Sequence, residues 1–227
     1  MFVARNALRL SGRNGLTSGR IAIRNATAVR TLATYSTLLD VTREIKLDHD
    51  NVRDLFARFG RATDQKEKTL IANTLIREMF VHSDAEEVSV YNVYARLGLD
   101  DTVQHNKEDH AEIKQLLWQV EHNATDVENY DSILGNAVNV FLAHAAEEEN
   151  VQHPKIRERL DVEQNDQIAR TFIKARNSIP THAYPLAPQT GGPLQKAMGI
   201  HGRVQEKMAK GAHSREYVDL KFEHPEV

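Results

Sequence analysis

One pattern of metal-binding residue types occurs twice in this 227-residue chain. Each copy begins with a histidine, continues after 33 or 34 residues with a second histidine, and ends with a glutamate four residues further on. Residues four apart on an α-helix lie on one face, one turn from each other. The pattern therefore constrains the chain to helices that pack side by side. The two copies consist of His49, His82 and Glu86, and of His110, His144 and Glu148.

The residues around the two copies align as well. Asp48 precedes His49 as Asp109 precedes His110, and in both segments apolar residues follow at the same spacings. A second glutamate directly follows the first in each copy, and the offset between the copies is 61 to 62 residues. Four imidazoles and two carboxylates that recur on a helical repeat suggest two hard-to-borderline metal ions held between helices.

Helical periodicity extends through the middle of the chain, which has no alternating run of β-branched residues long enough to predict a strand. The turns between the helices are short, so neighbouring helices must be antiparallel. We therefore predict an all-α fold, an up-down-up-down four-helix bundle with an additional C-terminal helix and an extended tail. The bundle helices are expected over residues 38–58, from 64 to beyond 90, over 102–122 and 127–153, and the fifth helix over 162–176.

Three positions are expected to interrupt these helices. Gly60 should end the first helix, because glycine favours the position just beyond a helix C-terminus. The second helix must end or bend within residues 91–98, since at about 1.5 Å per residue His82 and His110 otherwise lie at different heights. Pro154 should bend the fourth helix, because it has no N–H to donate and its ring crowds the preceding turn.

The N-terminal segment has a composition of its own. The first 39 residues contain six arginines but no lysine or acidic residue, and they are rich in Ser, Thr, Ala and Asn. This is typical of a mitochondrial transit peptide, and the scattered apolar residues form neither a secretory signal nor a membrane span. We expect a transit peptide over 1–35 and a mitochondrial, matrix location; a basic arm that binds nucleic acid is the alternative interpretation. After the transit peptide we expect a helical metal-binding domain over 36–178. A Pro/Gly-containing tail follows over 179–227, and part of it has the pattern of one short helix.

Charge and cysteine content limit the chemistry. Without the six N-terminal arginines, the formal net charge falls from −3 for the whole chain to −9 for residues 40–227. An acidic body argues against nucleic acid and anionic membranes as partners. The chain has no cysteine, which excludes disulfides, thiolate zinc sites, cysteine-ligated iron–sulfur clusters and a catalytic thiol. Any metal ion must therefore be held by nitrogen and oxygen atoms.

The repeat supplies one histidine from each of four helices and one glutamate from each of two. Each ion could take two imidazoles, while the two carboxylates could bridge between the ions. Buried glutamates are costly unless positive charge compensates them, and metal ions supply that charge. On iron, a coordination position left open can bind O₂ or another small molecule. The alternative interpretation is a polar core whose members satisfy one another.

The spacing of these six residues resembles the HHE cation-binding domain of hemerythrin-like proteins, over about residues 40–180. The glutamate pair in each copy and the Pro-Thr-His-Ala-Tyr-Pro segment at 180–185 belong to the resemblance. It implies a four-helix bundle with a non-haem di-iron centre, although zinc or manganese also accept such ligands. Glu86 and Glu148 are the candidates for bridging the two ions. The implied metal ligands are His49, His82, Glu86, His110, His144 and Glu148.

Two positions depart from the pattern of hemerythrins that carry oxygen. Lys114 stands where they have a further histidine, one turn after His110. Glu149 stands where they have an aspartate, five residues after His144, while Glu148 lies at four. These differences concern reversible O₂ carriage rather than the metal site itself.

The resemblance implies a protein that binds iron together with O₂ or a related small diatomic ligand, or that senses or stores iron. A di-iron oxidase, or an enzyme acting on peroxide or nitric oxide, is an alternative, although no substrate pocket is evident in the sequence. A helical interaction module that metal only stabilises is another. The remaining histidines of the bundle are expected to be solvated or to cap helices; they are His105, His122 and His153.

Overall fold

A computed structural model describes residues 38–123, 128–179 and 215–227, and the first two of these segments are almost entirely helical. The predicted transit peptide lies outside the described residues, and so does most of the predicted tail, including the segment 194–210 whose pattern indicates a short helix. The helices are α1 (Val41–Arg61), α2 (Gln65–Ser89), α3 (Tyr91–Arg96), α4 (Asp100–Glu121), α5 (Tyr130–Glu147), the π-helix η1 (Glu148–Gln152), α6 (His153–Arg157) and α7 (Val162–Arg176).

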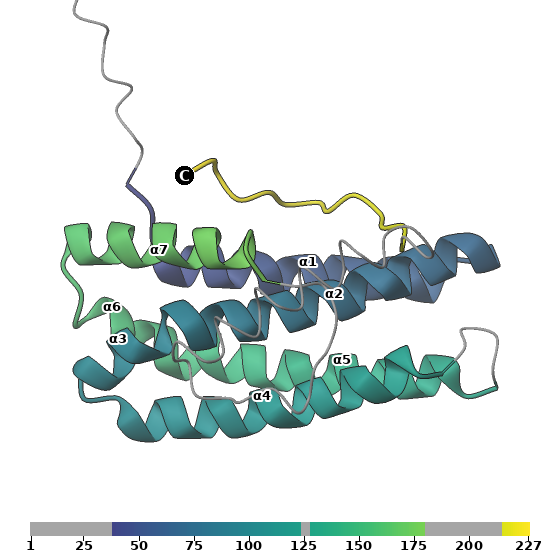
Figure 1. The fold of residues 1–227 in the computed structure, drawn as a ribbon, viewed down its shortest axis with the longest axis horizontal. Coiled ribbons are helices and arrows are strands. Elements are labelled where there is room, and N and C mark those ends of the chain that lie inside the picture. Colours follow the sequence, from purple (N-terminus) through teal and green to yellow (C-terminus); the bar gives the residue numbers. More distant parts are fainter. Residues whose placement is uncertain (1–37, 124–127, 180–214) are drawn as a thin grey trace, which may run out of the picture. The chain divides into compact units, whose positions relative to one another are not determined.

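The predicted all-α bundle is confirmed. The helices α1, α2, α4 and α5 run up and down beside one another, and α7 packs against α1 and α2 (Figure 1). Within the described residues there is no β-strand, and none of their helices is long and apolar enough to span a membrane.

Side-chain caps fix where several helices begin. The Asp64 carboxylate accepts the N–H of Glu67 and starts α2, as the sequence predicts. The prediction that Gly60 ends the first helix is wrong, because α1 continues to Arg61. The N–H of Ala62 still donates to the carbonyls of Arg58 and Phe59. A glycine is required at Gly98, where φ is +74° in the turn before α4.

Two interruptions set the register of the site. The break after α2 comes at Val90, just before the interval predicted from the sequence. Just before Pro154, where the sequence predicts a bend, the helix contains the π-helix η1, in which the N–H of His153 donates to the carbonyl of Glu148, five residues earlier. A π-turn of this kind inserts one residue into the helix and is frequent at functional sites.

A layer of polar side chains lies between two apolar clusters. One cluster contains Val52, Leu75, Phe80, Ile113 and Phe141, and the other contains Ile45, Val90, Tyr94, Ile156 and Phe172. The residues between them along each bundle helix are largely polar and fully buried. Burying so many polar groups is costly unless each has a partner, so this layer is the place to look for function.

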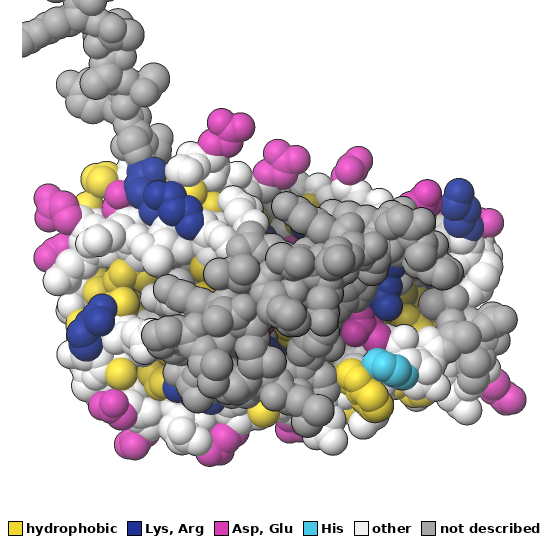
Figure 2. Space-filling view, viewed as in Figure 1, with side chains coloured by type: hydrophobic (Ala, Val, Ile, Leu, Met, Phe, Trp, Pro, Cys, Tyr) yellow, Lys and Arg dark blue, Asp and Glu magenta, His cyan; other side chains and the backbone are white. Residues whose placement is uncertain are grey.

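The surface differs from this interior. On the face shown in Figure 2, Asp and Glu side chains project around the edge of the described surface, with Lys and Arg side chains at a few places among them. Single apolar side chains are interspersed among them, as is normal for a folded domain.

The last 13 residues, 215–227, form an extended strap along α1 (Figure 1). The strap runs antiparallel to α1. Arg58, near the end of α1, donates to the carbonyl of Asp219. Asn51 exchanges two hydrogen bonds with the backbone of Phe222, and His224 contacts Asp48 in the first half of the helix. The strap is therefore fixed by specific polar contacts along its length, and His224 is largely buried rather than a surface residue.

The strap should contribute a pH-dependent part of the stability. Burial lowers the pKa of His224, but hydrogen bonds to Asp48 and Glu44 outweigh this effect and raise it to about 8. Because the pKa of His224 in the folded state lies above its unfolded value, the stabilisation is fully present below about pH 6.5 and is lost as pH rises through about 8. It contributes at most about 2 kcal/mol to the free energy of unfolding. Denaturant titrations of the protein and of His224→Gln should differ more at pH 6 than at pH 9. An equal difference at both values would contradict this expectation.

Candidate metal centre

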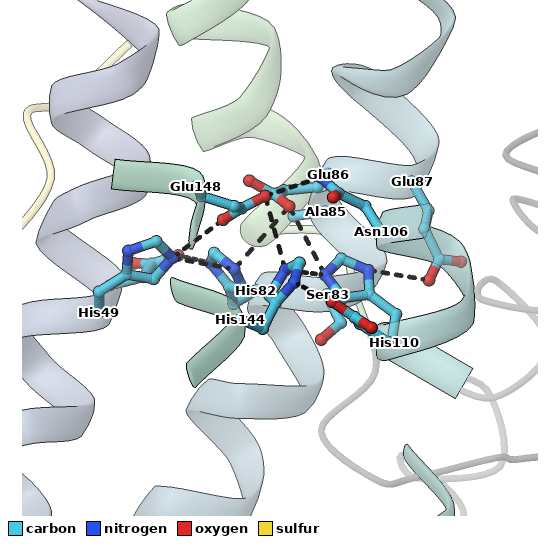
Figure 3. Close-up of polar contacts among 12 residues, drawn as sticks. His49, His82, Ser83, Ala85, Glu86, Glu87, Asn106, His110, His144 and Glu148 are labelled. Atoms are coloured by element: carbon cyan, nitrogen blue, oxygen red, sulfur yellow. Dashed lines mark hydrogen bonds and ion pairs between the residues drawn. The ribbon is translucent and has the colours of Figure 1, made fainter. Parts of the chain in front are cut away.

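All six residues of the sequence repeat lie in the buried polar layer. His49 comes from α1, and His110 comes from α4. The pairs one turn apart come from α2 and from the junction of α5 with η1. Each of the six side chains is at most 4% exposed, and the four imidazoles lie in a row beside the two carboxylates (Figure 3). The structure thus brings together every residue in the predicted ligand set.

The imidazoles form two pairs whose Nε2 atoms approach each other. The Nε2 atoms of His49 and His82 are 3.4 Å apart, and those of His110 and His144 are 3.0 Å apart. Two nitrogens bound at about 2.1 Å to one ion, at an angle between 90° and the tetrahedral value, would be roughly 3.0–3.4 Å apart. The spacing within each pair therefore fits one metal ion.

Each glutamate reaches one histidine of each pair. Glu86 Oε2 lies 3.9 Å from His82 Nε2 and 3.6 Å from His110 Nε2. Glu148 has Oε2 at 3.3 Å from His49 Nε2 and Oε1 at 3.5 Å from His144 Nε2. Two groups of donor atoms, each lying within 4.8 Å, could hold an ion: His82, Glu86, His110 and His144, and His49, His82 and Glu148. Each carboxylate therefore lies between the two histidine pairs.

The carboxylates have binding capacity that the protein leaves unused. Glu86 Oε1 and Glu148 Oε2 are buried and make no hydrogen bond, although Glu148 Oε2 lies close to His49. Burial raises the pKa of Glu148 well above its usual value, and the neighbouring Glu86 raises it further. Two adjacent buried carboxylates need a positive charge, so the donor set fits metal ions better than it fits a self-sufficient polar core.

Four further carboxylates, called the outer carboxylates here, contact the imidazole rings at Nδ1, on the side away from the centre. Each lies at 2.8–3.3 Å from an Nδ1 atom, where it accepts the Nδ1 proton and leaves the Nε2 lone pair facing the centre. These carboxylates are the residues that accompany the ligands in the sequence repeat. The contacts are Glu149 to His49, Asp48 to His82, Glu87 to His110, and Asp109 to His144.

Burial keeps two of the imidazoles neutral. It lowers the pKa of His49 well below the usual value, and the charge of His82 adds to the effect. It lowers the pKa of His110 in the same way, with a contribution from His144. Since only the neutral ring can bind a metal ion, the protein holds these rings ready for binding at neutral pH.

The two departures from the oxygen-carrying hemerythrins take structural roles. Lys114 is fully buried, and its Nζ lies 2.6 Å from Asp84 and 2.7 Å from Glu87, outside the group of possible ligands. Asp84 and Glu87 raise the pKa of Lys114 although burial opposes its charge. Glu149 contacts the outer nitrogen of His49, so Glu148 is the carboxylate at the centre.

Several residues of the centre were not predicted from the sequence. The Tyr91 hydroxyl donates to Glu86 Oε2 at 3.1 Å, and it lies 3.2 Å from both ring nitrogens of His110, over the face of that ring. Asn106 donates to Glu148 at 3.0 Å and exchanges hydrogen bonds with Gln152. No periodic signal distinguished these polar side chains from other residues of the repeat.

The outcome for the other three histidines differs. His122 is exposed, with its ring tilted against that of Trp118, and His105 is exposed beside Glu147, as expected for solvated residues. The expectation for His153 is wrong, because it is 3% exposed and its ring stacks 6.3 Å from that of His49. The π-helix turns His153 into the interior.

The model of the hemerythrin HHE cation-binding domain matches residues 40–156, which include all six residues of the centre. An uncharacterized hemerythrin-like protein of Schizosaccharomyces pombe is 23% identical over 164 residues, covering 71% of this chain and 80% of the relative. A protein of Nostoc named DNA nickase is 25% identical over 142 residues, covering 62% of this chain but only 40% of that protein. No solved structure matches the chain. With its helical bundle and its paired histidines and glutamates, the chain belongs to the hemerythrin HHE cation-binding domain family.

Proposed function

We propose that this protein binds two iron ions in the buried polar layer and uses them to bind O₂ or a related small diatomic ligand, or to sense or store iron. Zinc or manganese would fit the same nitrogen and oxygen donors. The proposed ligands are those of the sequence repeat: His49, His82, Glu86, His110, His144 and Glu148. Iron bound there would supply open coordination positions and one-electron chemistry to a small ligand.

One observation carries this proposal above the others. Each glutamate lies between the two histidine pairs, while the Nε2 atoms within each pair are separated by the distance that one ion requires. A polar core that satisfied itself would place donors opposite acceptors, whereas here acceptor nitrogens and carboxylate oxygens converge. Shared positive ions are the simplest group that completes such a set.

Elemental analysis and an optical spectrum of the purified protein test the proposal. After expression with ample iron, about two irons per chain are expected, together with an absorption band that changes on adding azide or nitric oxide. Less than about half an iron per chain would count against the iron centre, since its donor set binds ions as a pair.

Removal of the metal should lower the melting temperature substantially. An ion present at about 1,000 times its dissociation constant stabilises the folded state by about 4 kcal/mol. For a domain of this size, that corresponds to a fall of roughly 8–16 °C after dialysis against a chelator. Calorimetry before and after dialysis, with Fe(II) added back as the control, measures the effect. An unchanged melting temperature would contradict metal binding in the folded state.

An enzyme that acts on peroxide or nitric oxide is the second candidate. The observation that favours it is the Tyr91 hydroxyl, a buried proton donor that touches both Glu86 and the His110 ring. Turnover of either compound that depends on His110 would support the enzyme.

A large metal-dependent shift in melting temperature without any ligand-responsive absorption band would favour a helical interaction module that metal only stabilises.

The proposal includes a mitochondrial location, supported by the Arg-rich, acid-free composition of residues 1–35. It includes no nucleic-acid partner, because residues 40–227 carry a formal net charge of −9. Fractionation of cells that express the full chain with a C-terminal tag would test the location.

A further inference from the structure

Asp48 connects the metal centre with the C-terminal strap. Its Oδ2 atom lies 3.3 Å from Nδ1 of His82, and its Oδ1 atom lies 2.8 Å from Nε2 of His224. Asp48 is fully buried, whereas His224 belongs to the strap, 176 residues later in the chain. Two bonds therefore join the end of the strap to a proposed metal ligand.

Asp48 needs both of its cationic partners. Arg176 of α7 donates to Oδ2 at 2.6 Å, and His224 occupies Oδ1. Arg176 and His224 thus face the two oxygens of a fully buried carboxylate and supply the positive charge that it needs. A buried carboxylate that loses one such partner must reorient or take up other contacts. The position of Asp48, and with it the orientation of the His82 ring, therefore depends on a docked strap.

The other half of the repeat offers an internal comparison. Asp109 holds His144 as Asp48 holds His82, with Oδ2 at 2.9 Å from Nδ1. Asp109 is partly exposed, and it also lies 3.7 Å from Nε2 of His105, a surface residue of α4. In the described residues, the strap contacts only the first-half carboxylate of this pair. One histidine pair is thus coupled to the strap more directly than the other.

The strap has its own anchors away from Asp48. Thr74 accepts the N–H of Val218, and the Arg77 guanidinium lies 5.1 Å from the ring centroid of Tyr217. His224 also contacts Glu44 at 2.8 Å. The anchors allow the strap to be weakened at Tyr217 without altering any contact to Asp48, which provides a matched control.

We propose that the C-terminal strap is a positioning element of the metal centre: His224 fixes Asp48, which orients His82, so that strap docking and metal binding strengthen each other. This inference rests on the metal binding proposed above. A His82 ring that binds an ion through Nε2 must carry its proton on Nδ1, and that proton donates to Asp48. An Asp48 carboxylate held in place by the strap favours this tautomer, and an ion on Nε2 favours it as well, so the two effects act in the same direction. Linkage makes this coupling reciprocal: if a docked strap raises the affinity for metal by some factor, bound metal raises the equilibrium constant for strap docking by the same factor.

Competition titrations of Fe(II) against a chromophoric chelator, without O₂, test the first half of the proposal on the full chain. Loss of an outer-shell partner such as Asp48 typically weakens metal binding about 10- to 100-fold. His224 acts one hydrogen bond further out, so His224→Ala should weaken one of two Fe(II) equivalents by up to about 10-fold. His224→Gln, which keeps one donor, should recover part of the affinity. Tyr217→Ala, which leaves the bond from His224 to Asp48 in place, should lower the melting temperature and weaken the same Fe(II) equivalent clearly less than His224→Ala does. Wild-type affinity in His224→Ala, or an equal loss in Tyr217→Ala, would overturn the proposal.

Digestion by a carboxypeptidase tests the reverse direction and needs no variant. The C-terminus of the wild-type protein should be trimmed more slowly with Fe(II) than after metal removal, and His224→Ala should be trimmed at one rate in both states. Equal trimming of the wild type with and without Fe(II) would overturn the coupling while leaving metal binding intact. A wild-type protein that binds no Fe(II) would overturn the proposed function and this inference together.

Discussion

Replacing Glu148 by alanine should remove most of the bound metal, whereas replacing its neighbour Glu147 should have little effect. Glu148 reaches one histidine of each pair, so its loss weakens both ions at once. Because even outer-shell partners are worth about 10- to 100-fold, a loss of more than about 100-fold in affinity is expected. Glu147 is 44% exposed and contacts His105 at the surface, so Glu147→Ala is the matched control. Equal metal loss in the two variants would contradict the assignment.

The stability of Glu148→Ala without metal shows whether Glu148 is a metal ligand or a member of a polar core that needs no metal. Burial and Glu86 raise the pKa of Glu148, which means that its charged form is unfavourable without a cation. Glu148→Ala should therefore destabilise the metal-loaded protein and leave the metal-free protein as stable as before or more stable. Denaturant titrations in chelator and in excess Fe(II) measure both states. A variant equally destabilised in both would indicate that Glu148 serves packing alone.

Replacing Lys114 by methionine should cause the largest loss of stability among changes outside the ligand set. Methionine keeps the length of the side chain but removes the charge that Asp84 and Glu87 face. Breaking a buried ion pair by removing one partner typically costs about 3–5 kcal/mol, because the opposite charge stays buried. For a domain of this size, the melting temperature should fall by roughly 6–20 °C.

The control for this prediction lies on the same helix. Lys107 is partly exposed in α4, and Lys107→Met should change the melting temperature by little. Removing the acidic partners as well, in the triple variant with Asp84→Asn and Glu87→Gln, should recover part of the stability. If Lys114→Met were as stable as the wild type, the buried charges would be compensated by other groups.

The ligand set could be predicted from the sequence because helix periodicity and the repeat act together. A spacing of four residues places His82 and Glu86 on one face whatever the rest of the helix does. The recurrence of that pair at His144 and Glu148 then requires helices that meet. The second glutamate of each pair belongs to the repeat, but its role was not predicted: the sequence favours a solvated Glu149, whereas Glu149 and Glu87 are outer carboxylates in the structure.

Other parts of the site could not be predicted, because they depend on departures from ideal helices. Tyr91 and His153 each lie nine residues beyond a ligand histidine, and an ideal helix would place them on its opposite side. The break at Val90 and the π-helix at Glu148–Gln152 change the register, so both side chains turn inward. His224 carried no signal, because its partners in α1 lie about 180 residues away in the sequence.

The four outer carboxylates show how the two halves of the repeat depend on each other. Asp48 and Asp109 serve imidazoles of their own halves. Glu87 belongs to the first half yet holds His110 of the second, and Glu149 belongs to the second half yet holds His49 of the first. A lone half would thus lack an outer partner for one of its two rings. The duplicated sequence unit is not an autonomous metal module, and only the interlocked pair makes a complete centre.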